Sequence, residues 1–186
     1  MGGKCLVLVD EEGKKLVEGP ACTDNFQIVK FVFDDLEWHS VEQCFQGVKY
    51  LSERKLLVRD MLPSEGESDK HYGLRIWREG QGYEDQKNPR WHDVKVHVMY
   101  LINRAKYQHN PTLQEELLTT GDKIIWGKPS THLWQKWNGL IQMRIRDEIR
   151  SNNLDSAPLS QDELILSFKP NLDKYVKLGL LDERME

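Results

Sequence analysis

The chain has 186 residues and a formal net charge of −4 at pH 7, and 30% of its residues are charged. This length is enough for one domain with a sizeable hydrophobic core. The nearly balanced charge argues against a strongly basic nucleic-acid-binding protein, although a local basic patch is compatible with it.

Short strands and turns are predicted for the first part of the chain. Gly13 marks a turn between the first two strands, and the Asp34-Asp35 pair ends the third. A polar turn is expected at residues 23–26, between the second and third strands. The predicted strands are residues 3–9, 14–21 and 28–33.

The segment 37–49 is the most informative part of the sequence. Ser40 is expected to cap a helix. This helix places Glu42, Gln46 and Lys49 on one stripe, at the spacing of a shared helical face. A carboxylate, an amide and an amine beside an apolar stripe suit a pocket where a polar bond is broken away from water. Such a stripe is also common on solvated helix faces, so the residues alone leave both interpretations open. The neighbouring apolar stripe is Val41, Phe45 and Val48.

The middle of the chain is predicted to be mainly helical. Residues 51–72 indicate a short helix followed by an exposed loop, and residues 78–90 indicate a second polar loop. A long helix is expected from Trp91 to Asn110, followed by a shorter helix that stops at Gly121. The expected buried face of the long helix is Trp91, Val94, Val98, Ile102 and Ala105.

The remaining segments include one irregular stretch. Residues 123–137 are expected to form a tryptophan-rich loop around Pro129, before a helix over about residues 137–150. This helix is expected to turn its isoleucines inward and its arginines elsewhere. The isoleucines are Ile141, Ile145 and Ile149, and the arginines are Arg144, Arg146 and Arg150.

A linker is predicted after residue 150. Ser160 and Glu163 then form a capping box before a helical segment, and Lys174 to Leu181 predict a last short helix. A few strands followed mostly by helices predict an α+β fold, mostly helical. In this fold a small strand element packs against a helical core within a single domain.

The cysteine content and the hydropathy give an expected location. Cys5, Cys22 and Cys44 are widely spaced and form no CxxC pair, so neither a disulfide framework nor a structural zinc site is expected. No apolar run approaches the roughly 18–20 residues of a membrane span. The first residues lack the layout of a signal peptide. An intracellular protein, cytoplasmic or nuclear, is expected, with no cofactor, no metal and no membrane partner.

A series of segments resembles the NADAR family, also called the YbiA-like family. The likeness covers about residues 23–150. It implies a NADAR-like catalytic domain at residues 1–150 and a C-terminal extension at residues 151–186, packed on the same domain. The matching segments are Asn25-Phe26, SVEQCFQGVK at 40–49, Gly73-Leu74-Arg75, WHDVK at 91–95 with Met99, KYQHNP at 106–111, LLTTGD at 117–122 and GLIQMRIR at 139–146.

The sequence departs from the family pattern after Gly121. Trp126 stands near the position of an acidic residue of the family. Thr131 stands three residues before Trp134, where the family has an aspartate, and Gln135 replaces a glycine. This wall of the pocket is therefore expected to be rebuilt, either for different contacts or with a shifted or lost activity.

The resemblance implies N-glycosidase activity on a sugar attached to an exocyclic amine. In one mechanism Glu42 acts as general acid or base, assisting ring opening or directing water to C1. In the other, a largely neutral Lys49 attacks the opened imine and forms a Schiff base, while Glu42 moves protons. Lys49 leans toward the start of its helix, so the two heads can converge on one substrate. The structural alternative for Lys49 is a surface partner of Glu42 or Gln46.

Six further residues are candidate substrate contacts, and each has a structural alternative. The asparagine and the aspartate could bind ribose hydroxyls or close turns. The tryptophans could stack on a base or belong to a core. The arginines could pair with phosphates or with carboxylates of the protein. These candidates are Asn25, Trp91, Asp122, Trp134, Arg75 and Arg146.

The leading prediction is a hydrolase that removes an ADP-ribosyl or ribosyl group, with a preference for ADP-ribosylated guanine in nucleic acid. The tryptophan-rich loop favours this substrate because it would offer a flat apolar surface to a large nucleotide. The near-neutral charge indicates contact at a modified base rather than along the backbone. One alternative substrate is a ribosylated small molecule, a ribosylamino-pyrimidine phosphate of riboflavin biosynthesis. A non-catalytic module that binds ADP-ribose-like nucleotides is the other alternative, which the missing acids after Gly121 motivate; a structural partner protein is a third.

Overall fold

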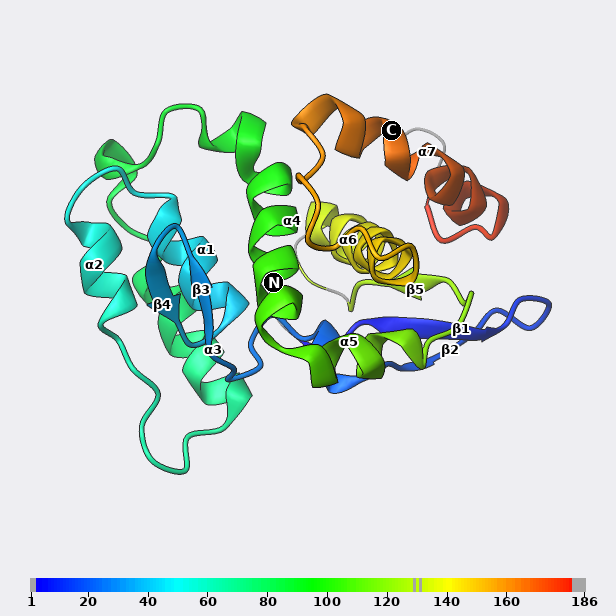
Figure 1. The fold of residues 1–186 in the computed structure, drawn as a ribbon, viewed down its shortest axis with the longest axis horizontal. Coiled ribbons are helices and arrows are strands. Elements are labelled where there is room, and N and C mark those ends of the chain that lie inside the picture. The colour runs from blue at the N-terminus through cyan, green and yellow to red at the C-terminus, as the bar shows by residue number, and fades with distance from the viewer. Residues whose placement is uncertain (1–2, 129, 131, 182–186) are drawn as a thin grey trace. The chain divides into compact units, whose positions relative to one another are not determined.

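The computed structural model describes residues 3–128, 130 and 132–181 (Figure 1). These residues form seven α-helices and five β-strands, which confirms an α+β fold with helices in the majority. The chain divides into two compact units, and each is described by itself. Unit 1 comprises Gly3 and Asp24–Leu113, and unit 2 comprises Lys4–Thr23 and the chain from Gln114 onward.

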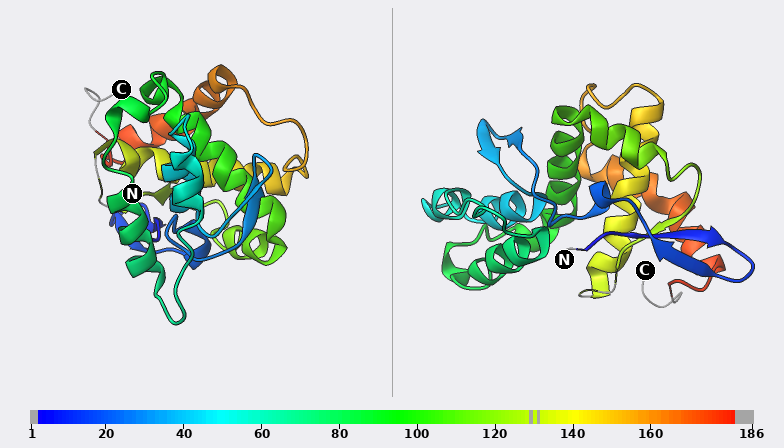
Figure 2. Two further views of the ribbon diagram at one scale, coloured as in Figure 1. Left: turned by 90° about the vertical axis from the view of Figure 1, so that its left-hand side faces the viewer. Right: turned by 90° about the horizontal axis from the view of Figure 1, so that it is seen from below.

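Unit 1 is built around the helix that carries the predicted stripe. Its elements are β3 (Phe31–Phe33), β4 (Leu36–Trp38), α1 (Val41–Val48), α2 (Arg54–Arg59), α3 (Asp69–Glu79) and α4 (Trp91–His109). Helix α1 contacts α2, α3 and α4, and it also contacts β4. Strands β3 and β4 form an antiparallel hairpin, and β3 contacts α4 (Figure 2).

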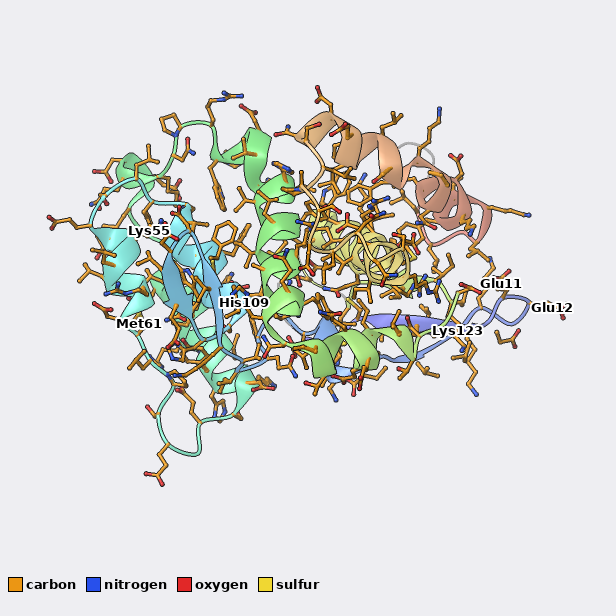
Figure 3. All side chains as sticks on the ribbon, viewed as in Figure 1. Glu11, Glu12, Lys55, Met61, His109 and Lys123 are labelled. Atoms are coloured by element: carbon orange, nitrogen blue, oxygen red, sulfur yellow. The ribbon has the colours of Figure 1, made fainter. Side chains whose placement is uncertain are left out.

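Asp34 and Asp35 form the two-residue turn of this hairpin. Both have a left-handed backbone, with φ of 55° and 57°, as the central positions of a type I′ turn require. Aspartate tolerates this conformation better than most residues. Lys55 of α2, labelled in Figure 3, forms an ion pair with Asp34. The sequence predicted the strand before the turn but not β4, which is only three residues long.

Trp38 fixes how α1 lies against the hairpin. Its side chain is fully buried, and its Nε1 donates to the carbonyl of Phe33 at 3.1 Å. A Cβ added at Gly47 would come within 2.7 Å of the Trp38 ring. The close approach of α1 to the hairpin therefore depends on a glycine at this position.

The exposed loop predicted up to residue 72 is shorter than expected, because α3 begins at Asp69. The hydroxyl of Ser68 caps this helix by accepting a hydrogen bond from the backbone of His71 at 3.3 Å. The loop prediction failed because the charged start of α3 hides its apolar face. That face joins a core cluster of Tyr50, Val58, Tyr72 and Ile76.

The prediction of a long helix from Trp91 is confirmed by α4. On its predicted inner face, Ile102 and Ala105 are buried together with Trp91. Val94 and Val98 are half-buried and line a cavity. The periodicity of the sequence thus identified the inner face of α4 correctly.

Unit 2 contains a three-stranded antiparallel sheet with the order β2-β1-β5. Its strands are β1 (Leu6–Asp10), β2 (Lys15–Glu18) and β5 (Ile125–Trp126), and its helices are α5 (Pro111–Leu118), α6 (His132–Arg150) and α7 (Gln161–Lys177). Helix α5 runs across the boundary between the units in sequence. Gly121, after the end of α5, has a φ of +54°, which fits its predicted role as the stop signal.

The irregular stretch predicted at residues 123–137 is wrong in two places. Ile125 and Trp126 form β5, which pairs with β1. Helix α6 begins at His132, so Trp134 and Trp137 lie on a helix and not in a loop. Long-range pairing with β1 and burial of the tryptophans stabilise these elements, and neither is visible in local sequence. Pro129 and Thr131 lie outside the described residues.

The C-terminal helices differ from the prediction in one respect. The capping box of Ser160 and Glu163 is confirmed, but a single helix α7 replaces the two predicted segments. Helix α7 continues through Pro170, which cannot donate to the carbonyl of Leu166. Leu166 is exposed, so solvent can satisfy that carbonyl. Residues 182–186 lie outside the described residues.

Each helix in residues 3–128, 130 and 132–181 is too short or too polar to serve as a membrane-spanning segment.

Candidate active site

The first turn of α1 is held in place from two sides. The hydroxyl of Ser40 accepts a hydrogen bond from the backbone of Gln43 at 3.0 Å, as predicted for the N-cap. The backbone N–H of Glu42 donates to the carbonyl of Asn25 at 2.8 Å. The amide of Gln43 donates to two carbonyls at the end of α2, those of Val58 at 3.1 Å and Arg59 at 2.7 Å. Helix α1 is therefore a rigid carrier for the side chains of its stripe.

The stripe of α1 forms a continuous chain of hydrogen bonds. Gln46 Nε2 donates to Glu42 Oε1 at 2.6 Å, and Lys49 Nζ donates to Gln46 Oε1 at 2.5 Å. Lys49 Nζ also donates to the carbonyl of Gly80, at the C-terminal cap of α3. Glu42 is 0% exposed and Lys49 is 5% exposed, so this is not a solvated helix face. We call Glu42, Gln46 and Lys49 the acid–amide–amine chain.

Glu42 has one oxygen that the protein does not use. Its Oε2 is buried and has no hydrogen-bond partner among the described residues. Burial raises the pKa of the Glu42 carboxyl, and the hydrogen bond from Gln46 and the charge of Lys49 oppose this shift only in part. A buried, unpaired carboxyl oxygen is unfavourable unless it carries a proton or meets a ligand. Glu42 is thus suited to exchange a proton with a bound molecule.

Lys49 is held beside this acid with an unusual acidity. Burial and, next, the nearby charge of Lys87 lower the pKa of Lys49 to about 8, while Glu42 and Glu84 act in the opposite direction. At pH 7 Lys49 is therefore mainly protonated, but its neutral form is more populated than that of an ordinary lysine. The carbonyl end of α3 favours the charged form, because it is the negative end of a helix dipole. Lys49 can serve as a cation near neutral pH and as an amine above it.

Asn25 lies at the start of this site and meets a residue that the sequence analysis missed. Asn103 Nδ2 donates to Asn25 Oδ1 at 3.3 Å and to the carbonyl of Met99 at 3.1 Å. Both asparagines are buried. A polar side chain next to Ile102 on the inner face of a predicted helix was the available signal. Asn25 thus closes a turn, as one interpretation predicted, and also joins a buried amide pair.

Trp91 combines packing with an edge on a cavity. Its ring lies 4.8 Å from the ring of Phe45 on α1, tilted by 53°. It also lines a cavity of about 330 Å³, together with Tyr50 of the segment after α1 and with Asn88. Trp91 is 8% exposed, so most of its surface belongs to the core. The structure brings Trp91 next to α1, but neither Glu42 nor Lys49 lines this cavity.

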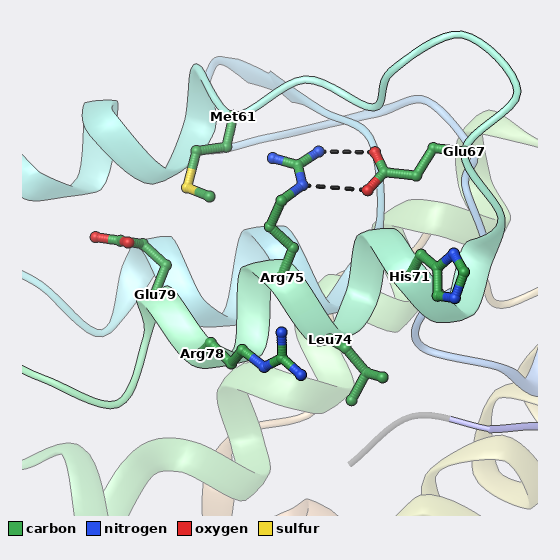
Figure 4. Close-up of a pocket in the computed structure, with 7 residues that line it drawn as sticks. All are labelled: Met61, Glu67, His71, Leu74, Arg75, Arg78 and Glu79. Carbon is green, nitrogen blue, oxygen red and sulfur yellow. Dashed lines mark hydrogen bonds and ion pairs between the residues drawn. The ribbon is translucent and has the colours of Figure 1, made fainter.

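Arg75 occupies a different side of unit 1. It lines a cavity of about 520 Å³ on α3, where it forms a two-point ion pair with Glu67, at 2.7 Å and 3.1 Å (Figure 4). It also donates to the carbonyl of Leu62 at 3.0 Å. Arg75 thus has the protein partner that sequence analysis left open as its alternative role, and a phosphate would have to displace Glu67.

Three predicted substrate contacts lie in unit 2, namely Asp122, Arg146 and Trp134. Asp122 is exposed and forms an ion pair with Arg150 at 2.7 Å. Arg146 is buried and donates to Thr120 Oγ1 at 2.9 Å and to the carbonyl of Lys123 at 2.8 Å. The prediction that the arginines of α6 point away from the core is therefore wrong for Arg146, because its guanidinium donates to these two acceptors inside unit 2.

The tryptophans of unit 2 do not form the open surface that was predicted. Trp134 on α6 is buried, and so is Trp126 of β5. Trp126 contacts the ring of Tyr175 edge-on, with 4.6 Å between centroids. Trp137 lies 5.9 Å from the ring of Phe168. Packing against α7 therefore uses surface that the prediction assigned to a nucleotide.

A metal site or a reactive thiol would be an alternative centre of chemistry. Among the described residues, no group of three His, Cys, Asp or Glu side chains is arranged to hold a metal ion. Burial raises the pKa of the Cys44 thiol well above its usual value, so it is a poor nucleophile.

Comparison with known proteins gives a family match, a relative in sequence and a relative in fold. The NADAR domain family matches residues 14–150. A riboflavin biosynthesis protein of Vibrio vulnificus (strain YJ016) is 29% identical over 141 residues, which cover 71% of this chain but only 35% of that protein. The NMR structure of the E. coli protein YbiA is similar in fold, with a TM-score of 0.56 and 21% identity over 74% of this chain and 82% of that chain.

The fold is α+β, and helix α1 of unit 1 buries an acid, an amide and an amine in line. This combination fits the NADAR-like class of protein that the sequence motifs indicated. The chain belongs to the NADAR family, because the family match covers well over half of it. The predicted resemblance is thereby confirmed, and the match already begins at residue 14, before the expected residue 23. It includes parts of both units.

Proposed function

We propose that this protein is an N-glycosidase that removes a ribosyl or ADP-ribosyl group from an exocyclic amine. The observation that carries the proposal is the Glu42 Oε2, which is buried at one end of the acid–amide–amine chain and has no hydrogen-bond partner among the residues that the structure describes. Burial keeps a proton on this carboxyl to higher pH than usual. Family membership supports the same chemistry, because the motif that carries Glu42 and Lys49 is part of the resemblance.

The proposed reaction uses Glu42 first as an acid and then as a base. Protonated Glu42 gives its proton to the exocyclic nitrogen while the C1–N bond breaks and positive charge develops on the sugar. The ionised carboxylate then takes a proton from a water molecule whose oxygen bonds to C1. The products are the free amine and the sugar with a hydroxyl at C1. The other route, in which neutral Lys49 forms a Schiff base at C1 and water later releases it, needs the minor form of Lys49 at pH 7.

The preferred substrate remains ADP-ribosylated guanine in nucleic acid, but its original support is weaker. The flat tryptophan surface that favoured it is used for packing in unit 2. The name of the Vibrio vulnificus relative favours a ribosylated pyrimidine phosphate of riboflavin biosynthesis as a second candidate.

Product release from both substrates tests the proposal directly. The protein is incubated with an ADP-ribosylated guanine oligonucleotide and, separately, with a ribosylamino-pyrimidine phosphate, and the released sugar is measured by chromatography. Release from either substrate supports an N-glycosidase, and the faster one identifies its class. Tight binding of both without release would contradict the enzyme and favour the nucleotide-binding module.

The pH dependence of turnover separates the two routes. If Lys49 acts as a cation beside Glu42, kcat falls as the pH rises through about 8, where Lys49 loses its proton. If Lys49 is the nucleophile, kcat rises through the same range. Borohydride added during turnover traps a sugar adduct only on the Schiff-base route, and Lys49→Ala abolishes that adduct.

A further inference from the structure

Gln46 joins the two titratable groups of the site through opposite ends of one amide. Its Nε2 donates to Glu42 and its Oε1 accepts from Lys49, at 2.6 Å and 2.5 Å. An ammonium only donates, and Glu42 Oε1 accepts whether the carboxyl is ionised or carries its proton on Oε2, so the two partners allow one orientation of the amide. Gln46 is 1% exposed, so water does not compete for these contacts. The charge on either partner therefore polarises the bond to the other.

Gly80 provides the second support of this arrangement. Its carbonyl accepts from Lys49 Nζ and, at 3.3 Å, from the hydroxyl of Tyr50. A Cβ added at Gly80 would lie only 1.9 Å from Gln46 Oε1. The φ of Gly80 is −74°, which any residue adopts, so its backbone does not require glycine. What requires glycine here is the close approach of the Gln46 amide.

We propose that Gln46 is a positioning residue that sets the protonation of Glu42 relative to that of Lys49. Gly80 is the seat of the Gln46 amide, by which we mean that the missing side chain at Gly80 leaves the space that this amide occupies. The inference rests on the proposed hydrolase function. It assigns no contact with substrate to either residue, and it places their effect on the geometry and proton affinity of the acid.

The other charges around the pair act only through space. Lys49 is affected by Lys87, Glu84 and Arg54, and Glu42 by Asp24. None of these replaces the amide bridge, because within the described residues the side-chain hydrogen bonds of Glu42 and Lys49 run to Gln46 and Gly80. Loss of the amide should therefore remove an acceptor from Lys49 and a donor from Glu42 at the same time. The pKa of Lys49 then falls and that of Glu42 rises further.

Titration of Gln46→Met tests the electrostatic part without needing turnover. Methionine keeps the length of the side chain but supplies no N–H donor and only a weak acceptor. The side-chain resonances of Lys49 are followed by NMR in the full-length protein across pH 6–11. The expected result is a midpoint below the wild-type value of about 8. An unchanged midpoint in a folded variant would overturn the inference, because a merely structural role for Gln46 would leave it in place.

Gly80→Ala tests the seat, with Gly82→Ala as the matched control. Nothing lies within 4 Å of a Cβ added at Gly82, so that variant should turn over like wild type. Gly80→Ala displaces the Gln46 amide, and kcat is expected to fall by about 100-fold with little change in KM. In a Gln46→Ala background the clash is gone, so Gly80→Ala should have little further effect.

The outcomes of this cycle separate the inference from the proposed function. If wild type releases no product from any substrate, the proposed function fails, while the titration of Gln46→Met still decides the coupling. If wild type is active and Gly80→Ala matches Gly82→Ala, the inference fails alone. Full additivity of the Gly80 and Gln46 effects would also overturn it.

Discussion

The two units each bury an ionisable side chain, and they hold it differently. In unit 1 the carboxyl of Glu42 accepts a hydrogen bond from Gln46, whose amide oxygen in turn accepts one from a second titratable group, Lys49. In unit 2 Arg146 is bonded to the hydroxyl of Thr120 and to the carbonyl of Lys123, which belong to the turn after α5. Both are almost fully buried, and in each one side-chain atom has no hydrogen-bond partner among the described residues. A buried charge held by backbone and hydroxyl groups stabilises a turn, whereas a buried acid linked to an amine through an amide is arranged to change its protonation.

Glu42→Gln tests the role of the buried acid in unit 1 and should have the largest effect, which is a loss of turnover. The amide can still accept from Gln46 but cannot carry the catalytic proton, so kcat is expected to fall by about 10² to 10⁴ with substrate affinity retained. The free energy of unfolding should not decrease, because a neutral side chain replaces an acid that is costly to bury. Steady-state kinetics, ligand titration and urea unfolding of the same preparation check this. Equal losses of affinity and stability would assign Glu42 a structural role.

Arg146→Met tests the role of the buried arginine in unit 2 and should lower the free energy of unfolding. The variant loses two charge-assisted hydrogen bonds, which lowers the free energy of unfolding by about 3 kcal/mol. Urea denaturation measures this loss. Arg150→Met is the control on the same helix, because its ion pair with Asp122 is exposed and should contribute less than about 1 kcal/mol. Equal effects of the two changes would show that the Arg146 contacts do not stabilise the turn.

The pH dependence of stability sharpens the difference further. The pKa of Lys49 in the folded protein is about 8, below its ordinary value, so the unfolded chain binds more protons above pH 8. The free energy of unfolding of wild type should therefore rise relative to that of Lys49→Met between about pH 8 and 10.4, by up to about 3 kcal/mol. Denaturation at several pH values tests this. A parallel pH dependence of the two proteins would mean that Lys49 titrates normally.

Arg75→Lys should have the smallest effect. Its two-point pair with Glu67 is partly exposed, and lysine keeps the charge but not the planar fork. The free energy of unfolding should fall by about 1 kcal/mol or less. If Arg75 instead bound a substrate phosphate, the same change would raise KM clearly while leaving the unfolding transition in place.

Local signals identified the central helix well. Ser40 was predicted as its cap, and the spacing of Glu42, Gln46 and Lys49 predicted their shared stripe. These features depend on hydrogen bonds and spacing within ten residues of chain. The helical repeat that begins at Trp91 was also visible, because Trp91, Ile102 and Ala105 recur at helical spacing and are buried in α4.

Features that depend on distant partners were not visible in the sequence. Strand β5 has only two residues and exists because β1 pairs with it. Trp134 was assigned to a loop because its burial comes from tertiary packing. Arg146 was expected outside the core because a single sequence does not show which acceptors will satisfy its charge. The role of Gln46 required coordinates, since the same stripe on an exposed helix would have no consequence for chemistry.

Gly47 makes the position of the reactive side chains of α1 depend on how closely this helix packs against the β3–β4 hairpin. Because the ring of Trp38 occupies the place of a side chain at this position, α1 is keyed to the β3–β4 hairpin on the face opposite its reactive groups. A methyl group added at Gly47 would clash with this ring and change the angle between α1 and the hairpin. That change would move the side-chain ends of Glu42 and Lys49. The reach of this acid can thus be retuned by a change that touches neither a charge nor a hydrogen bond.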